Sequence, residues 1–448
     1  MQAWTEATGI PMKIHQIKLK NFHCFEDREF SFGSRFNLII GDNATGKTTL
    51  LDALSVGLGS LFLGFPEPAS PRNITSDEVR LATYHHGDSW TVEPQYPTQV
   101  DCSGEVDGRQ GTWHRALTSK DGRTTRQDAD WIRAEASRLS EAVKQGQPAI
   151  LPVISYYGTG RLWVQLRQTK TKASKVDTLK PDTRFVGYLD CLNPASDVKR
   201  LLEWFKTQEI SALQQGTLNS TLEAARQAIL SCIPGGSHVG FDVSRDELMI
   251  RFAERSLPFS FLSDGYRNMV AMVADIAVRC ATLNPYLKAK SSQETPGVVL
   301  IDEIDLHLHP RWQRRVVDDL LRTFPKIQFF GTTHSPFVIQ SLPPIEGVQL
   351  LNLDDEHAEE FANKSVEDIS EEIQGIELPQ RSKRFKDMMK AAEEYFAILG
   401  KAEQATPAER DAMKARLDAL SMPYSDDPAY QAFLKMQRTS AGLDGEVQ

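Results

Sequence analysis

The sequence predicts an α/β fold with a central parallel β-sheet, because three short apolar runs have the length and character of buried strands. The runs lie at 36–40, 298–301 and 327–331. Each run leads directly into a polar segment. These segments begin at Gly41, Asp302 and Thr332. Their order and spacing indicate one composite site, built from parts of the chain that are far apart in sequence.

The first polar segment fits the phosphate-loop pattern G-x-x-x-x-G-K-[ST] in full. A predicted strand precedes it, and apolar residues after it recur at helical spacing, as the pattern requires. Gly41 and Gly46 allow the backbone to fold around phosphate oxygens, which backbone N–H groups would then face. We expect Lys47 to reach the β- and γ-phosphates of ATP, and Thr48 to hold Mg²⁺. The nucleotide-binding residues predicted here are Gly41, Asp42, Asn43, Ala44, Thr45, Gly46, Lys47, Thr48 and Thr49.

The second polar segment places two carboxylates directly behind an apolar strand. We expect Asp302 to bind Mg²⁺, directly or through water. Glu303 is expected to polarise the attacking water, because phosphoryl transfer depends mainly on positioning and charge stabilisation. A solvated acidic turn is the alternative, and the nearby buried strand together with the phosphate loop disfavours it.

The third polar segment contributes a histidine. His334 follows a strand end, from which it is expected to reach the γ-phosphate and report its presence. The alternative is a histidine that only caps the turn before Pro336.

These motifs in this order resemble the ABC-type ATPases: a phosphate loop, an LS-x-G signature, an acidic strand end and a switch histidine. The opening MKIHQIKLKNFHCFEDREFSFGSRFNLIIGDNATGKTTLLDAL resembles the soluble RecF, SMC and OLD branch rather than transporter ATPases. DEIDLHLHP and FGTTHSPFVIQS are similar to the PtuA-type ATPase subunits of Septu and retron-associated anti-phage systems. The resemblance implies a P-loop NTPase with a two-lobed nucleotide-binding domain, and ATP and Mg²⁺ as cofactors.

In such proteins the signature of one subunit closes over the ATP of another, so the resemblance implies a homodimer or a larger homo-oligomer. The matching signature residues here are Leu262, Ser263, Asp264 and Gly265. Asp305 matches the loop that communicates across the dimer. Asp264 and Tyr266 stand where the family usually has glycine and glutamine. An extra carboxylate near the triphosphate is repulsive unless it points away, so ATP held as a structural ligand stays an open alternative.

The sequence divides into five predicted parts. They are a leader at 1–11, an ATPase lobe at 12–160, a helical insertion at 161–235, a second ATPase lobe at 236–352 and a helical partner-binding region at 353–448. Residues 61–72 are rich in Pro and Gly and are expected to form a linker. Predicted helices span 128–144, 195–208, 219–233, 381–399 and 407–420. No glutamine stands where the family has a Mg²⁺-contacting one, and Arg161 is a possible substitute.

The insertion contains a basic segment, Arg161–Arg184, with seven basic residues against two acidic ones. The basic residues are Arg161, Arg167, Lys170, Lys172, Lys175, Lys180 and Arg184, and the acids are Asp177 and Asp182. Such a loop is suited to nucleic-acid phosphates. A solvated loop without a partner is an equally good interpretation, because charge runs are usually just solvated.

Composition is that of an ordinary globular chain of 448 residues, with a net charge of −9 that argues against a globally basic nucleic-acid binder. No apolar run reaches the roughly 18 residues of a membrane helix, so no membrane span is expected. The five cysteines are scattered and lack metal-ligand spacing, which indicates reduced thiols and a cytoplasmic location. The C-terminal region lacks strand-ended acidic residues, so no nuclease site is expected there.

Two classes of function follow. The first is a regulatory ATPase of an anti-phage system, which controls a separate HNH-type nuclease by binding and hydrolysing ATP. For this class the resemblance also implies a possible retron reverse transcriptase with its RNA–DNA hybrid. The second is a RecF-like DNA-repair ATPase, which binds DNA when ATP closes the dimer.

Overall fold

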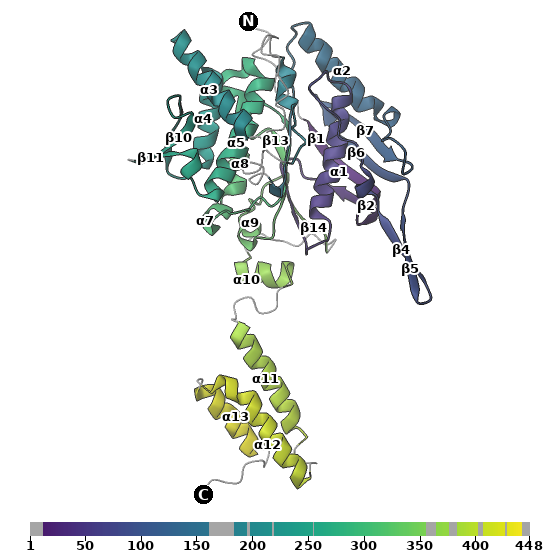
Figure 1. Cartoon of the computed structure of the whole chain (residues 1–448), viewed down its shortest axis with the longest axis vertical. Helices are drawn as coiled ribbons and strands as arrows, with labels where there is room; N and C mark the ends of the chain where they lie inside the picture. Colours follow the sequence, from purple (N-terminus) through teal and green to yellow (C-terminus); the bar gives the residue numbers. More distant parts are fainter. Residues whose placement is uncertain are drawn as a thin grey trace. The chain divides into compact units, whose positions relative to one another are not determined.

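A computed structural model of the chain contains two compact units, Met1–Lys364 and Ser365–Gln448 (Figure 1). The second unit thus begins twelve residues after the predicted boundary at 353 (365 − 353 = 12). The structure describes residues 12–160, 183–194, 198–216, 219–253, 255–354, 364–375, 383–401, 406–425 and 428–440. The predicted leader, 1–11, lies outside the described residues.

A five-stranded parallel sheet forms the centre of the first unit. Its strands are, in order, β14 (Val348–Asn352), β3 (Phe36–Ile40), β13 (Ile327–Thr332), β12 (Gly297–Ile301) and β8 (Val153–Tyr157). All but β14 are buried along their whole length, as expected for strands covered on both faces. Ile301 pairs with both Gly331 and Tyr157, so the carboxyl ends of β13, β12 and β8 are in register. The predicted α/β fold is confirmed.

Helix α1 (Lys47–Gly59) contacts both the central sheet and a four-stranded antiparallel sheet. The second sheet has the order β2 (Phe25–Ser31), β1 (Lys13–Phe22), β6 (Thr98–Val106) and β7 (Arg109–Leu117). Because sheets cover it on two sides, α1 is buried around most of its circumference, and not only at the apolar residues that recur at helical spacing. Trp113 of β7 donates a 2.9 Å hydrogen bond to the carbonyl of Gly57. The phosphate-loop helix is therefore held rigidly.

The helical part of the first unit surrounds α5 (Asp264–Leu283), the helix that begins at the signature. Its neighbours include α3 (Val198–Gln215), α4 (Ser220–Cys232) and η6 (Arg184–Tyr188), and α8 (Val316–Thr323) packs on α4. The predicted helices at 195–208 and 219–233 correspond to α3 and α4, and Asn219 caps α4 by accepting from Thr221 and Leu222 N–H groups. The sequence prediction missed an antiparallel sheet of β9 (Gly236–Asp242), β10 (Glu247–Phe252) and β11 (Arg255–Pro258).

The predicted linker at 61–72 is wrong, because most of its apolar side chains pack inside the protein. Leu61 and Phe62 are buried in η2 (Ser60–Leu63), the short helix that follows α1. Phe65 lies against Phe185 and Tyr188, with ring centroids 5.2 and 5.1 Å apart. Pro and Gly here shape a turn, while the aromatic side chains decide that the segment is buried.

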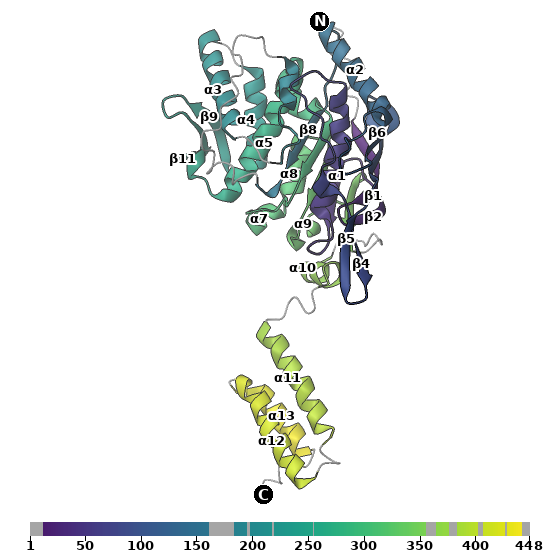
Figure 2. The same ribbon diagram turned by 45° about the vertical axis from the view of Figure 1, so that its right-hand side comes forward.

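Two elements beside the core complete this unit. Helix α2 (Asp130–Lys144), predicted at 128–144, packs on the segment after α1. The hairpin of β4 (Leu81–His86) and β5 (Ser89–Pro94) projects from the body and leaves Leu81 and Trp90 mostly exposed (Figure 2).

The second unit is built on three helices, α11 (Lys383–Leu399), α12 (Pro407–Ser421) and α13 (Pro428–Ser440). Tyr395, Leu399, Leu417 and Leu434 form its core. The predicted helices at 381–399 and 407–420 are present, and α13 was missed. The apolar side chains of α11 divide into two groups: Tyr395 and Leu399 are buried, whereas Met389 and Phe396 are exposed. Within the described residues, no helix has the length and apolar character needed to span a membrane.

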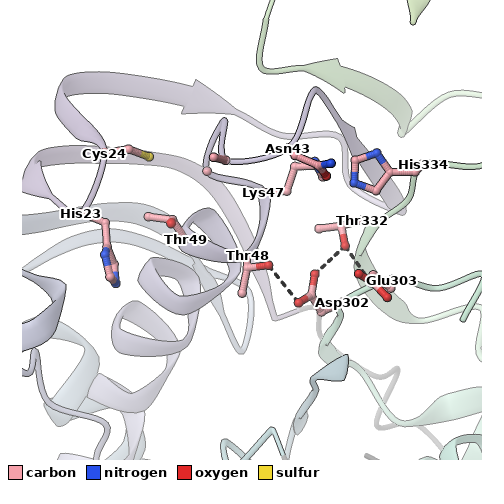
Figure 3. A pocket seen from close by; sticks show the side chains of 12 residues that line it. His23, Cys24, Asn43, Lys47, Thr48, Thr49, Asp302, Glu303, Thr332 and His334 are labelled. Carbon is pink, nitrogen blue, oxygen red and sulfur yellow. Dashed lines mark hydrogen bonds between the residues drawn. The ribbon is translucent and has the colours of Figure 1, made fainter. Parts of the chain in front are cut away.

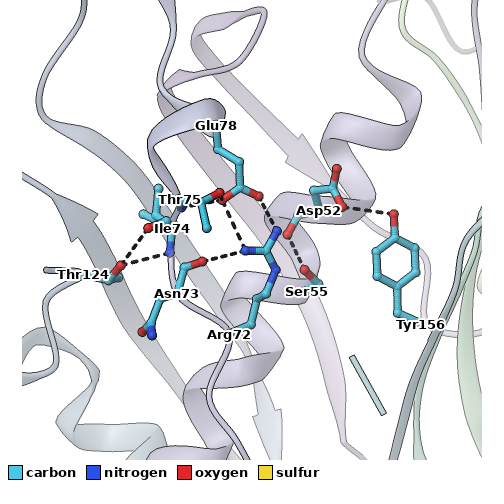
Figure 4. A network of polar contacts seen from close by, with 9 residues as sticks. All are labelled: Asp52, Ser55, Arg72, Asn73, Ile74, Thr75, Glu78, Thr124 and Tyr156. Atoms are coloured by element: carbon cyan, nitrogen blue, oxygen red, sulfur yellow. Dashed lines mark hydrogen bonds and ion pairs between the residues drawn. The ribbon is translucent and has the colours of Figure 1, made fainter. Parts of the chain in front are cut away.

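Asp52 of α1 is a half-buried carboxyl behind the phosphate loop (Figure 4). It accepts a 3.1 Å hydrogen bond from Tyr156 of β8, beside a network in which Arg72 and Thr75 bind Glu78. Burial raises the pKa of Asp52 to about 6, and the Tyr156 hydrogen bond opposes that rise only in part. The folded protein therefore favours the protonated carboxyl, whose contribution to stability is complete below pH 3.8 and is lost as pH rises through about 6.

Asp52→Asn is expected to stabilise the first unit by about 1–2 kcal/mol above pH 7, because the amide keeps the acceptor without the charge. The gain should shrink towards zero as pH falls to 4. Chemical denaturation across pH 4–8 measures this difference. Asp88→Asn, an exposed change in the β4–β5 turn, is the control. A stability difference for Asp52→Asn that does not vary with pH contradicts the prediction.

Candidate nucleotide-binding site

A cavity of about 380 Å³ lies at the carboxyl ends of the central strands (Figure 3). It brings together all three polar segments predicted from the sequence. The lining residues are His23, Cys24, Asn43, Ala44, Gly46, Lys47, Thr48, Thr49, Asp302, Glu303, Thr332 and His334.

The phosphate loop has the backbone that its glycines predict. Gly46 has φ 103°, and a Cβ there would lie 2.6 Å from Cys24 Sγ and from the Phe25 ring. Lys47 Nζ reaches across the loop and donates to the carbonyls of Gly41 and Asp42, at 2.8 and 2.7 Å. Burial lowers the pKa of Lys47, while the carboxylates of Asp354 and Asp302 raise it. The ammonium thus sits in a partly enclosed site and balances the charge of nearby carboxylates.

Hydroxyl groups from two segments hold Asp302. Thr48 Oγ1 donates to Asp302 Oδ2 at 2.9 Å, and Thr332 Oγ1 donates to Asp302 Oδ1 at 2.6 Å. Thr332 Oγ1 in turn accepts the N–H of Glu303 at 2.7 Å. Asp302 is only 4% exposed, so these bonds fix a buried carboxylate beside the phosphate-loop hydroxyl.

Glu303 and His334 form the end of the cavity opposite His23 and Cys24 (Figure 3). Glu303 has φ 48°, a left-handed conformation that is uncommon for a residue other than glycine. The turn cap that the sequence offered as an alternative role for His334 is supplied by Ser335, which accepts from Phe337 and Val338 N–H groups. The side chain of His334 lines the cavity instead.

Sequence reasoning missed several residues of the site. Thr332 was assigned no role, although it joins Asp302 to Glu303. Asp354, just past β14, accepts a 2.6 Å hydrogen bond from the N–H of Asp42 and so braces the phosphate loop. His23 and Cys24 come from the turn between β1 and β2. Asn21 and His23 have positive φ angles, which are typical of a tight turn, but the sequence NFHCF is only a weak signal for one.

The signature does not line this cavity, although its residues are all described by the structure. Ser263 is the exposed N-cap of α5, and Gly265 follows in its first turn. A Cβ on Gly265 would lie 2.4 Å from the carbonyl of His307, so glycine permits a close approach here. Ser263 and Asp264 are therefore exposed, whereas Leu262 and Gly265 are buried, on a helix packed against the segment that follows Glu303.

The two departures from the family pattern have partners within the chain. Asp264 forms an ion pair with Arg267, whose hydrogen bond lowers the pKa of the carboxyl. Tyr266 lies between Phe252 and Trp312, with ring centroids 5.5 and 4.1 Å apart. Thus Arg267 partly neutralises the charge of Asp264, and Tyr266 serves packing.

Asp305 accepts a hydrogen bond from Thr333 Oγ1, which ties this predicted dimer-contact residue to the segment carrying His334. Arg161 and most of the basic segment, 161–182, lie outside the described residues. Arg184 belongs to η6, and its guanidinium donates to the carbonyls of Leu283 and Ala149 at 2.6 and 2.8 Å. These bonds hold the half-buried Arg184 against the fold, and contact of the basic segment with nucleic acid stays a prediction.

Comparison with known proteins agrees with this geometry. An AAA-domain family matches residues 16–233, and a second AAA-domain family, whose description names the AbiEii toxin of a type IV toxin–antitoxin system, matches 249–340. The "Retron Ec83 probable ATPase" of Escherichia coli is 26% identical over 393 residues, which cover 75% of this chain and 70% of that protein. The "Septu protein PtuA" of Bacillus thuringiensis is 21% identical over 380 residues, 81% of this chain and 84% of that protein.

A third relative is the "OLD nuclease" of Thermus scotoductus, 23% identical over 364 residues. The match covers 76% of this chain but only 62% of that nuclease. The resemblance drawn from the motifs is confirmed by these matches. With its phosphate loop, acidic strand end and histidine in one cavity of a parallel α/β sheet, the chain is a P-loop ATPase that is similar to the retron, Septu and OLD proteins.

Proposed function

We propose that the chain is the regulatory ATPase of an anti-phage defence complex, in which two copies close on ATP and so control a separate nuclease. The proposal rests on one observation, which is that the nucleotide cavity and the signature lie at different places on the same chain. One cavity holds the residues suited to ATP and its hydrolysis, while the signature lies outside it on an exposed helix start. Such a site is complete only when a second copy supplies its signature.

Within the cavity, ATP is proposed to lie with its nucleoside towards His23 and Cys24 and its γ-phosphate towards Glu303 and His334. The backbone of the loop from Gly41 to Thr49 and the N-terminus of α1 would bind the phosphates. Lys47 would exchange its loop carbonyls for phosphate oxygens. His334 is exposed at the cavity wall, from where its side chain would contact the γ-phosphate.

Mg²⁺ fits the oxygen donors of this site. Thr48 and Asp302 offer a hydroxyl and a carboxylate that lie within hydrogen-bond distance of each other. Mg²⁺ prefers oxygen ligands, and in such sites it is usually bound by protein oxygens together with the phosphates of the substrate. The ion would neutralise charge on the phosphates. Thr332 would keep the Asp302 carboxylate turned towards that position.

Glu303 is proposed to orient and polarise the attacking water. The backbone N–H of Glu303 donates to Thr332 Oγ1, which holds Glu303 next to Asp302. In this proposal Asp302 is the metal ligand and Glu303 is not. Asp302 binds Thr332 Oγ1 through its carboxylate and Glu303 binds it through its backbone N–H, so the two carboxylates are assigned separate roles.

Closure by a second copy is supported by the surface next to the signature. Phe261 directly precedes Leu262 and Ser263, and it is 79% exposed. Its neighbours Phe259 and Leu262 are buried, which fixes the backbone that presents this ring. We propose that Phe261, Ser263 and Gly265 approach the nucleotide cavity of the second copy. There the exposed ring of Phe261 would become buried.

The defence role is supported by the retron and Septu relatives, and the nuclease partner is proposed to be of the HNH type. The second unit offers a surface for it. Phe396 of α11 and Phe433 of α13 are in contact, with centroids 5.9 Å apart, yet are 38% and 47% exposed. Met389 and Met436, on the same two helices, are also exposed. Apolar side chains outside the core of a small helical unit are typical of a docking surface.

A pull-down of the Glu303→Gln protein, produced with its neighbouring genes in the presence of ATP and Mg²⁺, tests the partner. We expect an HNH-type nuclease, with or without a reverse transcriptase, and its loss when Phe396 and Phe433 are both changed to serine. Leu213→Ser, at a 71% exposed position of α3, is the control. Repair factors and chromosomal DNA without a nuclease contradict the proposal and favour the RecF-like alternative.

A further inference from the structure

Tyr157, the last residue of β8, touches both halves of the proposed composite site. Its backbone carbonyl accepts the N–H of Asp302 at 2.8 Å. Its hydroxyl donates to Asp275 Oδ2 of α5 at 2.7 Å. One residue therefore joins the start of the acidic segment to the helix that begins at the signature.

The hydroxyl of Tyr157 is held in a defined polar cluster. Arg279, one turn further along α5, donates to the same Asp275 oxygen at 2.7 Å and to the carbonyl of Gly187 at 2.8 Å. Burial, followed by the charge of Asp275, raises the pKa of Tyr157, so its hydroxyl remains a proton donor. The charges of Asp275 and Arg279 balance each other. The Tyr157 hydroxyl therefore orients the Asp275 carboxylate and does not neutralise it.

A second contact ties the start of α5 to the segment that follows Glu303. Asn268 Nδ2 donates to the carbonyl of Leu306 at 3.1 Å, and Gly265 packs against the carbonyl of His307. The helix is thus fixed to the acidic segment near its first turn and to the edge of the central sheet near its middle. These two attachments form a contiguous path of contacts between Asp302 and the signature helix.

The preceding residue makes the opposite connection. Tyr156 points to the other face of β8, where its hydroxyl donates to Asp52 of α1. The end of β8 therefore contacts the phosphate-loop helix on one face and the signature helix on the other. This edge strand lies between the residues that bind the nucleotide and the residues that would meet a second copy.

We propose that Tyr157 is a positioning residue that couples nucleotide binding at Asp302 to the orientation of the signature helix, through its hydrogen bond to Asp275. The coupling acts within one chain, although its use in closing a dimer rests on the function proposed above. Tyr157 touches neither substrate nor metal in this account.

The test isolates one copy. Ser263→Arg is used as background, because a bulky cation at the signature blocks closure by a second copy. Hydrogen exchange of the α5 amides is measured with and without ATP and Mg²⁺, in Ser263→Arg alone and combined with Tyr157→Phe. Tyr188→Phe is the matched control, since this buried tyrosine loses a 2.8 Å hydrogen bond to the carbonyl of Pro152, just before β8.

We expect ATP to change the exchange of α5 in the background and in the Tyr188→Phe control, but not with Tyr157→Phe. ATP affinity and thermal stability should match between the two tyrosine variants. In the protein with an intact signature, Tyr157→Phe should lower kcat about fivefold or more and leave KM within about twofold. Asp275→Asn, which keeps the side-chain shape, should act in the same direction.

An unchanged ATP response of α5 in Tyr157→Phe overturns the inference, and so does the absence of any ATP response in the background. Equal loss in Tyr157→Phe and Tyr188→Phe also overturns it, because the effect is then general loosening around β8. Failure of the wild-type protein to associate with ATP is a different result. It overturns the proposed dimer and leaves the one-chain measurement to decide the role of Tyr157.

Discussion

Glu303→Gln is expected to lower kcat for ATP hydrolysis by about a hundredfold or more, while ATP affinity stays near that of the wild type. Glutamine keeps the shape of the side chain and the backbone N–H that binds Thr332. It removes the negative charge that would polarise water beside the γ-phosphate. Steady-state phosphate release measures the turnover, and nucleotide titration measures the affinity.

Glu29→Gln, on the exposed side of β2, is the control for this experiment. It makes the same chemical change far from the cavity and is expected to leave both quantities unchanged. Wild-type turnover in Glu303→Gln would show that the water is oriented by another group. A large loss of ATP affinity would instead place Glu303 in nucleotide binding.

Lys47→Ala is expected to weaken ATP binding by about a hundredfold, because a charge-assisted contact to phosphate in a partly enclosed site is lost. The carboxylates near this position add to the effect. Asp354 and Asp302 both act on Lys47, so removal of the ammonium leaves them facing a triphosphate without a balancing cation.

Calorimetric titration with ATP and Mg²⁺ measures this loss, with Lys18→Ala on β1 as the control. Lys18 is an exposed residue that pairs with Asp27 at 3.5 Å and is remote from the cavity lining. Unchanged ATP affinity in Lys47→Ala contradicts the assignment of the phosphate loop.

The centre of the fold was predictable because its strands are short, apolar along their whole length and followed by polar residues. β3, β12 and β13 need no knowledge of their neighbours to be recognised. β9 and β10 were missed because their buried residues alternate with exposed or half-buried ones, and β11 because none of its four residues is fully buried. The error at 61–72 has the opposite cause, since Pro and Gly concealed buried aromatic residues.

The candidate site shows the same limit. Residues within a contiguous motif, such as Lys47 and Thr48, could be assigned from spacing alone. Asp354 could not, because its partner Asp42 is 312 positions away and no local pattern marks a brace for the phosphate loop. Thr332 was missed for a related reason, since its role depends on strand register between β12 and β13.

The signature illustrates a local conflict that only the structure explains. Sequence reasoning identified Asp264 and Tyr266 as unusual and expected repulsion near a triphosphate. In the structure, Arg267 pairs with Asp264, and Tyr266 packs between two aromatic rings. These contacts supply a reason for both residues, while the strength of closure on ATP stays a prediction.

In the proposed mechanism each ATP is enclosed by two copies of the chain. Complementation between two defective variants tests this most directly. Lys47→Ala keeps the signature and lacks the phosphate-loop lysine, whereas Ser263→Arg keeps the loop and lacks the signature. Each alone is expected to hydrolyse little ATP. When the two variants are mixed in equal amounts, half of the dimers contain one copy of each. One of the two sites in such a dimer is complete, so the mixture should recover roughly a quarter of wild-type activity. Activity no greater than the sum of the two separate variants would contradict the claim.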